Sequence, residues 1–183
     1  MGRNGQGGGE ADVVIAGAGP VGLVAALVLA RAGVRVVLLE KRHSLNTASK
    51  ASTFHPATLE ILNELGLLDS VLAEGEVVRT IQYRTPDGVF AEFPMDRLAA
   101  QTPFPYRLHL EQARVTPIAL ERLRGYANAT VMFDTEIVSV AQDGEGVTVG
   151  VRSGDRDGQL RAAYLLGTDG ARSATREALG IDF

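Results

Sequence analysis

Residues 13–22 read VVIAGAGPVG, and residues 35–40 read RVVLLE. The first four residues of the earlier stretch are apolar and mostly β-branched, which predicts a buried strand. Residues 20–32 are rich in Ala, Leu and Val and stop at Gly33, which predicts a helix closed by a left-handed glycine. The second apolar stretch predicts another buried strand. The order strand, helix, strand indicates a βαβ unit with a parallel sheet.

The loop between the first strand and the helix has the glycine pattern G-x-G-x-x-G. The pattern is weak alone, but here it follows a strand and opens a helix, which is the context that gives it meaning. Gly17 allows the tight turn, Gly19 lets a pyrophosphate approach, and Gly22 lets the helix pack closely on the strand. The helix N-terminus offers N–H groups and a partial positive charge to phosphates.

Glu40 ends the second strand, where a carboxylate accepts hydrogen bonds from ribose hydroxyls and repels a 2′-phosphate. A glycine loop and an acid in this order predict a site for FAD or NAD rather than for NADP. The alternative interpretation is that the glycines are ordinary turn residues and that Glu40 merely ends a strand. It requires the strand, loop, helix, second strand and acid to occur in this order by coincidence.

Length and composition exclude several classes of protein. The chain has 183 residues, 45% hydrophobic and 22% charged, with a net charge of −4 and no cysteine. The composition is typical of a globular protein. The absence of cysteine rules out disulfides and cysteine-based zinc sites. The net negative charge means that the chain lacks the broad positive field expected of a nucleic-acid-binding protein. Glycines and a proline break the uncharged residues 13–30, so no membrane span is expected. Residues 1–10 are half glycine, which predicts a flexible tail.

The rest of the sequence predicts an α/β fold in which an antiparallel part is added to the parallel sheet. The expected elements are a helix from Pro56, strands at 77–85 and 89–93, a helix through 119–126 with Pro117 in its first turn, and strands at 136–141, 147–152 and 159–166. Turn-forming residues link the last three strands, so they are expected to form a three-stranded antiparallel meander.

Residues 164–176, YLLGTDGARSATR, run from an apolar strand through an Asp-Gly turn toward a helix. Asp169 then stands at the carboxyl end of a strand, where ligands bind in open α/β sheets. Arg172 and Arg176 add positive charge beside it. A plain strand-to-helix turn with two solvated arginines explains this segment equally well.

Taken together, these segments resemble the FAD-dependent aromatic hydroxylases of the para-hydroxybenzoate hydroxylase type. The resemblance covers residues 12–183. It is carried by the glycine loop with Glu40, by the Asp-Gly motif at 167–176, by Lys50-Ala51 before a Leu-rich helix, and by Gln112 at the opening of the next helix. It implies a Rossmann-like FAD-binding domain, with the meander added to its parallel sheet.

The resemblance also implies which residues bind the cofactor FAD. They are Gly17, Ala18, Gly19, Pro20, Val21, Gly22, Glu40, Lys41, Arg42, Lys50, Ala51, Gln112, Ile137, Asp169 and Arg176. In such a site Glu40 holds the ribose, the loop backbone holds the pyrophosphate, and Ile137 lies by the adenine. The family usually has Arg where this chain has Lys50, and a lysine gives a point charge instead of a planar fork.

The implied reaction inserts one oxygen atom of O2 into a phenolic or other aromatic small molecule, with NADPH or NADH as co-substrate. The expected location is the cytoplasm. The cofactor carries the difficult chemistry in such enzymes. We expect no metal site and no general base among His43, His55 and His109, which are scattered and lack a partnered nucleophile. The sequence does not indicate an oligomeric state.

The resemblance further implies that relatives continue into a second Gly-Asp motif and a sheet that covers the substrate. We therefore expect an N-terminal FAD-binding fragment, with residues 11–183 as the FAD-binding domain and the hairpin within 77–100 belonging to an incomplete substrate domain. Such a fragment alone is not expected to be a competent hydroxylase. Two other functions stay open: another FAD-dependent oxidoreductase of the same fold, such as a halogenase or a reductase, and a non-catalytic nucleotide-binding module.

Overall fold

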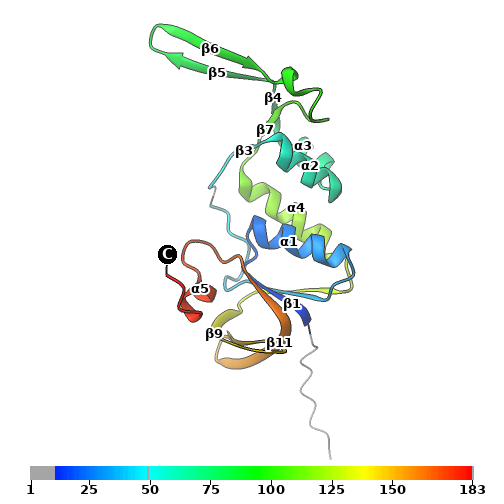
Figure 1. Ribbon diagram of the computed structural model, residues 1–183, viewed down its shortest axis with the longest axis vertical. Coiled ribbons are helices and arrows are strands. Elements are labelled where there is room, and N and C mark those ends of the chain that lie inside the picture. The colour runs from blue at the N-terminus through cyan, green and yellow to red at the C-terminus, as the bar shows by residue number, and fades with distance from the viewer. Residues whose placement is uncertain (1–10, 49, 183) are drawn as a thin grey trace, which may run out of the picture. The chain divides into compact units, whose positions relative to one another are not determined.

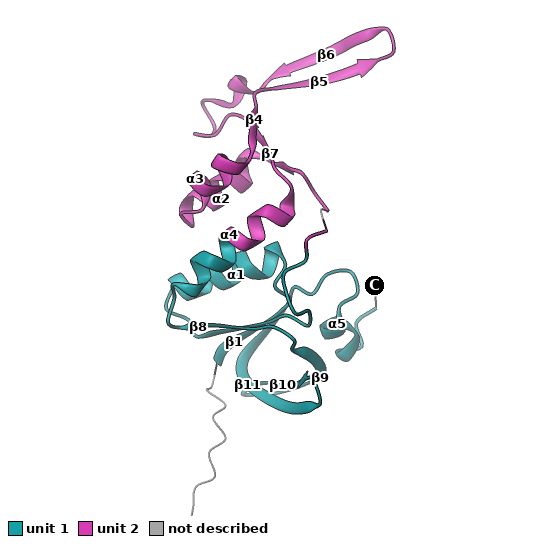
Figure 2. Ribbon diagram, turned by 180° about the vertical axis from the view of Figure 1, so that it is seen from behind, with its two compact units in different colours: residues 1–46, 119–183 teal, residues 47–118 magenta. Residues whose placement is uncertain are grey.

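The computed structural model describes residues 11–48 and 50–182 (Figure 1). It divides into two compact units, residues 1–46 with 119–183 and residues 47–118 (Figure 2). The flexible tail expected at residues 1–10 lies outside the described residues.

The first unit is built on a six-stranded sheet in the order β8-β2-β1-β11-β10-β9. Parallel pairing joins β8, β2, β1 and β11, whereas antiparallel pairing joins β11, β10 and β9. The strands are β1 (Ala11–Ala16), β2 (Val36–Leu39), β8 (Ala129–Met132), β9 (Glu136–Asp143), β10 (Gly146–Ser153) and β11 (Arg156–Gly167). The predicted α/β fold with a parallel sheet and a three-stranded meander is confirmed.

Strand β11 joins the meander to the parallel sheet. Its first half pairs antiparallel with β10 and its second half pairs parallel with β1, and the two pairings meet at Ala162, which lies opposite both Val147 and Ala11. The meander is therefore continuous with the parallel sheet, because one strand of 12 residues serves both parts. The two parts share a core of buried side chains. It comprises Ala11, Val14, Ala16, Leu39, Ile137, Val147, Val149, Val151 and Ala162.

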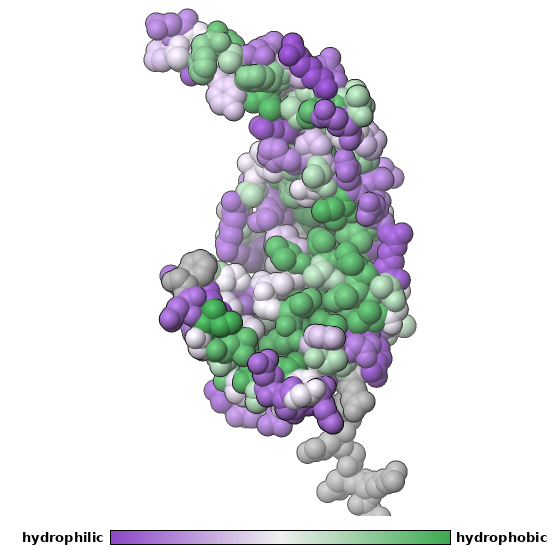
Figure 3. Space-filling view, viewed as in Figure 1, coloured by the Kyte–Doolittle hydropathy of each residue, from purple (hydrophilic) through white to green (hydrophobic). Residues whose placement is uncertain are grey.

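Helix α1 (Pro20–Arg31) begins directly after the glycine loop and packs on β1 and β2. Proline suits its first position because the N–H that proline lacks has no partner within a helix there. Gly33, with a φ of +83°, ends the helix as predicted. The helix is apolar on nearly all sides, and the surface over it is largely hydrophobic (Figure 3), with Val21 and Val28 at least half exposed.

The second unit holds two small sheets and short helices. One sheet has the order β3-β7-β4, and the other is the hairpin β5-β6. The elements are β3 (Thr53–Phe54), α2 (Pro56–Glu64), α3 (Leu68–Glu74), β4 (Glu76–Val78), β5 (Thr80–Thr85), β6 (Gly88–Pro94), a 3-10 turn at Met95–Leu98, β7 (Arg107–His109) and the start of α4 (Gln112–Arg124). The strand expected at 77–85 is wrong as one element, because β4 and β5 belong to different sheets.

The start expected for the helix around Pro117 is also wrong. Helix α4 begins at Gln112, so Pro117 lies inside it and removes one backbone donor. The carbonyl of Ala113, four residues earlier, accepts instead from the hydroxyl of Thr116 at 3.2 Å. This side-chain hydrogen bond supplies the missing partner and lets the helix run through the proline.

Candidate functional site

The three glycines of the loop between β1 and α1 have different surroundings. Gly17 has a φ of +95°, and a Cβ there would lie 2.9 Å from the Cα of Asp169. A Cβ on Gly22 would lie 2.0 Å from the carbonyl oxygen of Gly17 and 2.7 Å from the hydroxyl oxygen of Thr168. A Cβ on Gly19 would meet no atom within 4 Å, and φ there is an ordinary −73°. The chain's own packing therefore requires Gly17 and Gly22, whereas Gly19 faces open space.

The N-terminus of α1 is open to a ligand of negative charge. Among the described residues no side chain caps it, and its first turn holds no acidic residue. The first N–H groups of a helix have no partner within the helix, and the macrodipole places partial positive charge there. The arrangement suits a phosphate, as the sequence predicts.

Glu40 lies at the end of β2 and is only 6% exposed. Its Oε2 accepts a hydrogen bond from the N–H of Ala18 at 3.0 Å, and its Oε1 accepts from the N–H of Arg42 at 3.0 Å and from Nη1 of Arg42 at 3.3 Å. A carboxylate offers roughly four lone-pair positions, so acceptor capacity remains for a ribose hydroxyl. The predicted ribose-binding acid is thus held directly beside the glycine loop.

The segment after Glu40 lies beside the turn after β8. The N–H of Asp134 donates to the carbonyl of Arg42, and the N–H of Thr135 donates to the carbonyl of Glu40, both at 3.0 Å. Asp134 has a φ of +51°, the one positive value outside glycine in the described part of the chain, and its Oδ2 lies 2.9 Å from Nδ1 of His43. Sequence reasoning missed this contact, since nothing local marks the two segments as neighbours.

Lys41, Arg42 and Ile137 occupy different environments in the first unit. Lys41 and Arg42 are exposed, and Arg42 forms an ion pair with Glu40. Ile137 is 8% exposed, and its side chain belongs to the shared core of the sheet. Little of the Ile137 side chain is therefore accessible to a ligand.

The carboxylate of Asp169 is engaged by its own turn. Oδ1 accepts from the hydroxyl of Ser173 at 2.6 Å, and Oδ2 accepts from the N–H and the hydroxyl of Thr175 at 3.1 and 3.2 Å. Burial raises the pKa of Asp169, but these hydrogen bonds outweigh burial, so the pKa lies below its ordinary value. Ser173 Oγ in turn accepts from the N–H of Arg176 at 3.0 Å and caps α5 (Ala174–Ala178). Asp169 thereby fixes the shape of the turn.

Thr168 connects this turn to the glycine loop. Its N–H donates to the carbonyl of Ala16 at 3.0 Å, and its single hydroxyl proton is shared between the carbonyls of Ala16 at 2.6 Å and Gly17 at 3.1 Å. Sequence reasoning missed Thr168. The available signal was its position just before Asp169, at the end of a strand that could pair with the first one.

Lys50, Ala51 and Gln112 belong to the second unit, whereas the other predicted site residues belong to the first. Lys50 and Ala51 are exposed. The N–H of Gln112 donates to the carbonyl of Ala51 at 2.8 Å, and Gln112 opens α4 as predicted. The structure thus brings together two residues that lie 61 positions apart in the sequence (51 and 112).

Neither a metal cluster nor a membrane span is present in the described ranges. No group of three His, Cys, Asp or Glu side chains there is placed to hold a metal ion. No helix formed by residues 11–48 or 50–182 is long and apolar enough to cross a membrane. His55 and His109 are exposed, and Nδ1 of His43 lies 2.9 Å from Oδ2 of Asp134.

Comparison with known proteins shows the family to which the chain belongs. The FAD binding domain family matches residues 10–183, which is nearly the whole chain. The chain belongs to this family. The resemblance drawn from the sequence is therefore confirmed, and so is FAD as the cofactor of this domain.

Relatives of this FAD binding domain are named as monooxygenases. The chain is 34% identical over 172 residues to a para-nitrophenol 4-monooxygenase of Pseudomonas sp. (strain WBC-3), covering 93% of this chain and 43% of that protein. It is 35% identical over 175 residues to a 6-methylpretetramide 4-monooxygenase of Streptomyces rimosus, covering 94% and 31%. The crystal structure of a p-nitrophenol 4-monooxygenase from Pseudomonas putida DLL-E4 superposes with a TM-score of 0.90 at 34% identity, covering 95% and 44%. The chain therefore spans less than half the length of these relatives.

The residues of this FAD binding domain fit the cofactor. The open space at Gly19 and the uncapped N-terminus of α1 suit a pyrophosphate, and the buried carboxylate of Glu40 suits the hydroxyls of a ribose. A further solved relative, aklavinone-11 hydroxylase in a ternary complex with FAD and aklavinone, superposes with a TM-score of 0.77 at 34% identity, covering 93% of this chain and 35% of that one. FAD thus accompanies this fold in a solved relative.

Proposed function

We propose that the chain is the FAD-binding part of a monooxygenase that inserts one oxygen atom of O2 into an aromatic small molecule, with NADPH or NADH as the reductant. The observation that carries the proposal is the glycine loop, open at Gly19 and held beside the buried Glu40, in a chain whose relatives are named as monooxygenases. The bound flavin supplies the redox chemistry and the activation of oxygen. The cytoplasmic location expected from the sequence stays a prediction.

In the first unit, each group has a distinct part in binding. The backbone of residues 17–22 and the N-terminus of α1 bind the pyrophosphate. Glu40 accepts hydrogen bonds from the adenosine ribose, while Lys41 and Arg42 place positive charge beside it. The backbone of Ile137 lies by the adenine, because its side chain is committed to the core. Asp169 and Arg176 act through the turn that they build.

In the second unit, Lys50, Ala51 and Gln112 are proposed to approach the flavin nucleotide, as the resemblance implies. The hydrogen bond from Gln112 to Ala51 supports a common role for these two residues, because it holds both backbones in one place. The exposed Lys50 supplies a cation for a phosphate or for the reduced nicotinamide.

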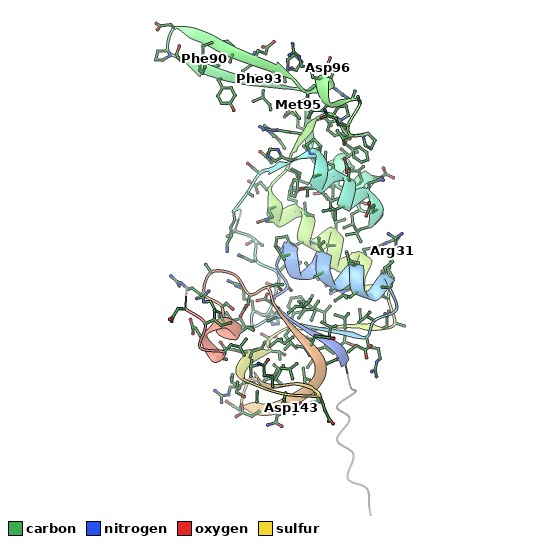
Figure 4. The ribbon with its side chains drawn as sticks, in the orientation of Figure 1. Arg31, Phe90, Phe93, Met95, Asp96 and Asp143 are labelled. Atoms are coloured by element: carbon green, nitrogen blue, oxygen red, sulfur yellow. The ribbon has the colours of Figure 1, made fainter. Side chains whose placement is uncertain are left out.

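The hairpin β5-β6 is proposed to belong to a substrate-binding part, and residues 11–183 otherwise to an FAD-binding domain. In the part of the chain that the structure describes, the hairpin pairs with no third strand. Tyr83, Phe90 and Phe93 are each at least half exposed, and the ring centroid of Tyr83 lies 6.1 Å from that of Phe90 and 5.9 Å from that of Phe93. Figure 4 shows Phe90 and Phe93 on the hairpin. A two-stranded hairpin is marginally stable alone, so this aromatic face supports a role in further packing.

An oxygen-labelling experiment tests the proposed reaction. The whole protein is loaded with FAD and given NADPH or NADH, a panel of phenols and nitrophenols, and ¹⁸O-labelled O2. We expect a product that gains one labelled oxygen atom, detected by mass spectrometry. Oxidation of NADPH with unlabelled product would indicate a reductase, labelled peroxide with no labelled product would reject hydroxylation of the panel, and FAD binding with no NADPH oxidation would indicate a nucleotide-binding module.

A further inference from the structure

Two consecutive peptide groups at the start of the glycine loop are each held from both sides. In the peptide group between Ala16 and Gly17, the carbonyl accepts from Thr168 at 2.6 and 3.0 Å, and the N–H donates to the carbonyl of Leu39 at 2.7 Å. The N–H and C=O of a trans peptide point in opposite directions. This peptide group is thus pinned between the residue that follows β11 and the end of β2.

The next peptide group, between Gly17 and Ala18, is held in the same way by two side chains. Its carbonyl accepts from the hydroxyl of Thr168 at 3.1 Å, and its N–H donates to the carboxylate of Glu40 at 3.0 Å. We propose that Thr168 is a positioning residue for FAD, and that its hydroxyl and Glu40 together clamp the Gly17–Ala18 peptide in the orientation that the pyrophosphate requires. This inference rests on the proposed function of the loop.

A clamp is needed because glycine does not hold a peptide orientation by itself. Gly17 and Gly19 flank Ala18, and glycine reaches positive and negative φ with similar ease, so the peptide between Gly17 and Ala18 can rotate. Rotation would turn a carbonyl oxygen toward a bound phosphate and repel it. Rotation would also move the carbonyl oxygen of Gly17, which lies 2.0 Å from the position of a Cβ on Gly22. The close packing of α1 on the loop would then be disturbed.

Thr168 is itself fixed in place by its surroundings. Gly167 pairs in parallel with Ala16, which sets the end of β11 beside the end of β1. Asp169 is held by hydrogen bonds from Ser173 and Thr175. The hydroxyl therefore acts from a rigid support, which is what a positioning residue needs.

The hydroxyl is isolated by comparing two variants of the whole chain. Thr168→Ser keeps the hydroxyl and removes the methyl group, whereas Thr168→Ala removes both. We expect Thr168→Ala to weaken FAD binding about threefold to tenfold, the loss of one hydrogen bond, and Thr168→Ser to stay within about twofold of the parent chain. The readout is quenching of FAD fluorescence on titration with the protein.

A second readout needs no FAD. In the nucleotide-free chain, we expect the amide hydrogen of Ala18 to exchange with solvent about threefold to tenfold faster in Thr168→Ala than in the parent chain, and at nearly the parental rate in Thr168→Ser. A third readout uses Glu40, the other residue of the clamp. When Glu40→Gln is combined with Thr168→Ala, the fold-loss in FAD affinity should be smaller than the product of the two separate fold-losses. Both changes release the same peptide group, so their effects overlap.

Thr102 provides the control. It is a buried threonine whose hydroxyl donates to Oε1 of Glu60 at 2.5 Å, but it lies in the second unit, and neither residue is a proposed FAD contact. Thr102→Ala should lower thermal stability while leaving FAD affinity and Ala18 exchange at the parental values.

The outcomes separate this inference from the proposed function. A parent chain that fails to bind FAD would refute the proposed function, and the exchange of Ala18 would still decide the clamp. Equal FAD affinity and equal Ala18 exchange in the parent chain and in Thr168→Ala would overturn the clamp, as would an equal loss of affinity in Thr102→Ala. If Thr168→Ala does not fold, Thr168→Val keeps the side-chain volume without the hydroxyl and is judged by the same two measurements.

Discussion

Exchanging single glycines of the loop for alanine separates the glycine needed by the ligand from the glycine needed by the fold. The structure predicts opposite behaviour for Gly19→Ala and Gly22→Ala. At Gly19 the backbone is extended and a new methyl group meets no atom within 4 Å. At Gly22 a methyl group would stand 2.0 Å from the carbonyl oxygen of Gly17, which is backbone and cannot swing aside.

The expected free energies of unfolding follow from these surroundings. Gly19→Ala gains about 0.4–1 kcal/mol because the unfolded chain loses freedom, and loses a comparable amount because alanine is a poorer N-cap than glycine. The two terms nearly cancel. Gly22→Ala gains up to about 1 kcal/mol in helix propensity, but the overlap forces the loop to move and costs about 1–3 kcal/mol or more, as in an overpacked core. Only the second variant should be clearly destabilised.

The assay measures the two properties separately on the whole chain. Thermal unfolding without nucleotide should place Gly19→Ala within about 2 °C of the parent chain and Gly22→Ala several degrees lower, since 1 kcal/mol shifts the Tm by about 2–4 °C at this size. Titration with FAD should show at least about a tenfold loss of affinity for Gly19→Ala, because the methyl group occupies the approach of the pyrophosphate.

Gly144 supplies the matched control, because it has ordinary φ and open space around its Cβ position but lies between β9 and β10. Gly144→Ala should leave both the Tm and the FAD affinity close to the parental values. The reasoning is refuted if Gly19→Ala binds FAD as tightly as the parent chain, or if Gly19→Ala loses more stability than Gly22→Ala.

Three other perturbations test separate parts of the structure. Glu40→Ala should weaken FAD binding by about 1–3 kcal/mol, the usual value of hydrogen bonds to a charged group, measured by calorimetric titration. The hydrogen bond from Arg161 lowers the pKa of Asp143 to about 2. Its stabilising effect is therefore present above the unfolded pKa of about 4 and is lost as the pH falls from 4 to 2. In urea unfolding, Asp143→Asn should be less stable than the parent chain above pH 4, and this difference in the free energy of unfolding should disappear as the pH falls to 2. Ser173→Ala removes the cap of α5 and one partner of Asp169, and should lower the free energy of unfolding by about 1–2 kcal/mol in urea titrations.

The part of the site that the sequence predicted is the part encoded locally. The strand, the glycine loop, α1 and β2 follow each other within residues 11–39 and Glu40 comes next, so periodicity and turn residues suffice to place Gly17, Gly22 and Glu40. The start of α4 at Gln112 was implied by the family resemblance and not by the local pattern, which placed the start near Pro117.

The errors arise where side-chain hydrogen bonds decide the structure. The hydroxyl of Thr168 reaches Ala16 across 152 positions of sequence, and no local pattern encodes that contact. Asp169 looks in the sequence like a free acid at a strand end, but its own turn supplies three donors. Proline usually opens a helix, yet Pro117 lies inside α4 because the hydroxyl of Thr116 replaces the missing donor.

The parallel pairing of β11 with β1 makes one structural unit of two motifs that stand about 150 residues apart in the sequence. Ala16 at the end of β1 pairs with Gly167 at the end of β11. The residues that follow these two strand ends therefore lie side by side: Gly17 packs on the backbone of Asp169, and the hydroxyl of Thr168 donates to the carbonyl of Gly17. The Asp-Gly turn can therefore influence nucleotide binding without touching the nucleotide, because its shape sets the loop that does. We therefore propose that the donors around Asp169 support FAD affinity by holding the loop, and that the acid that faces the ribose is Glu40.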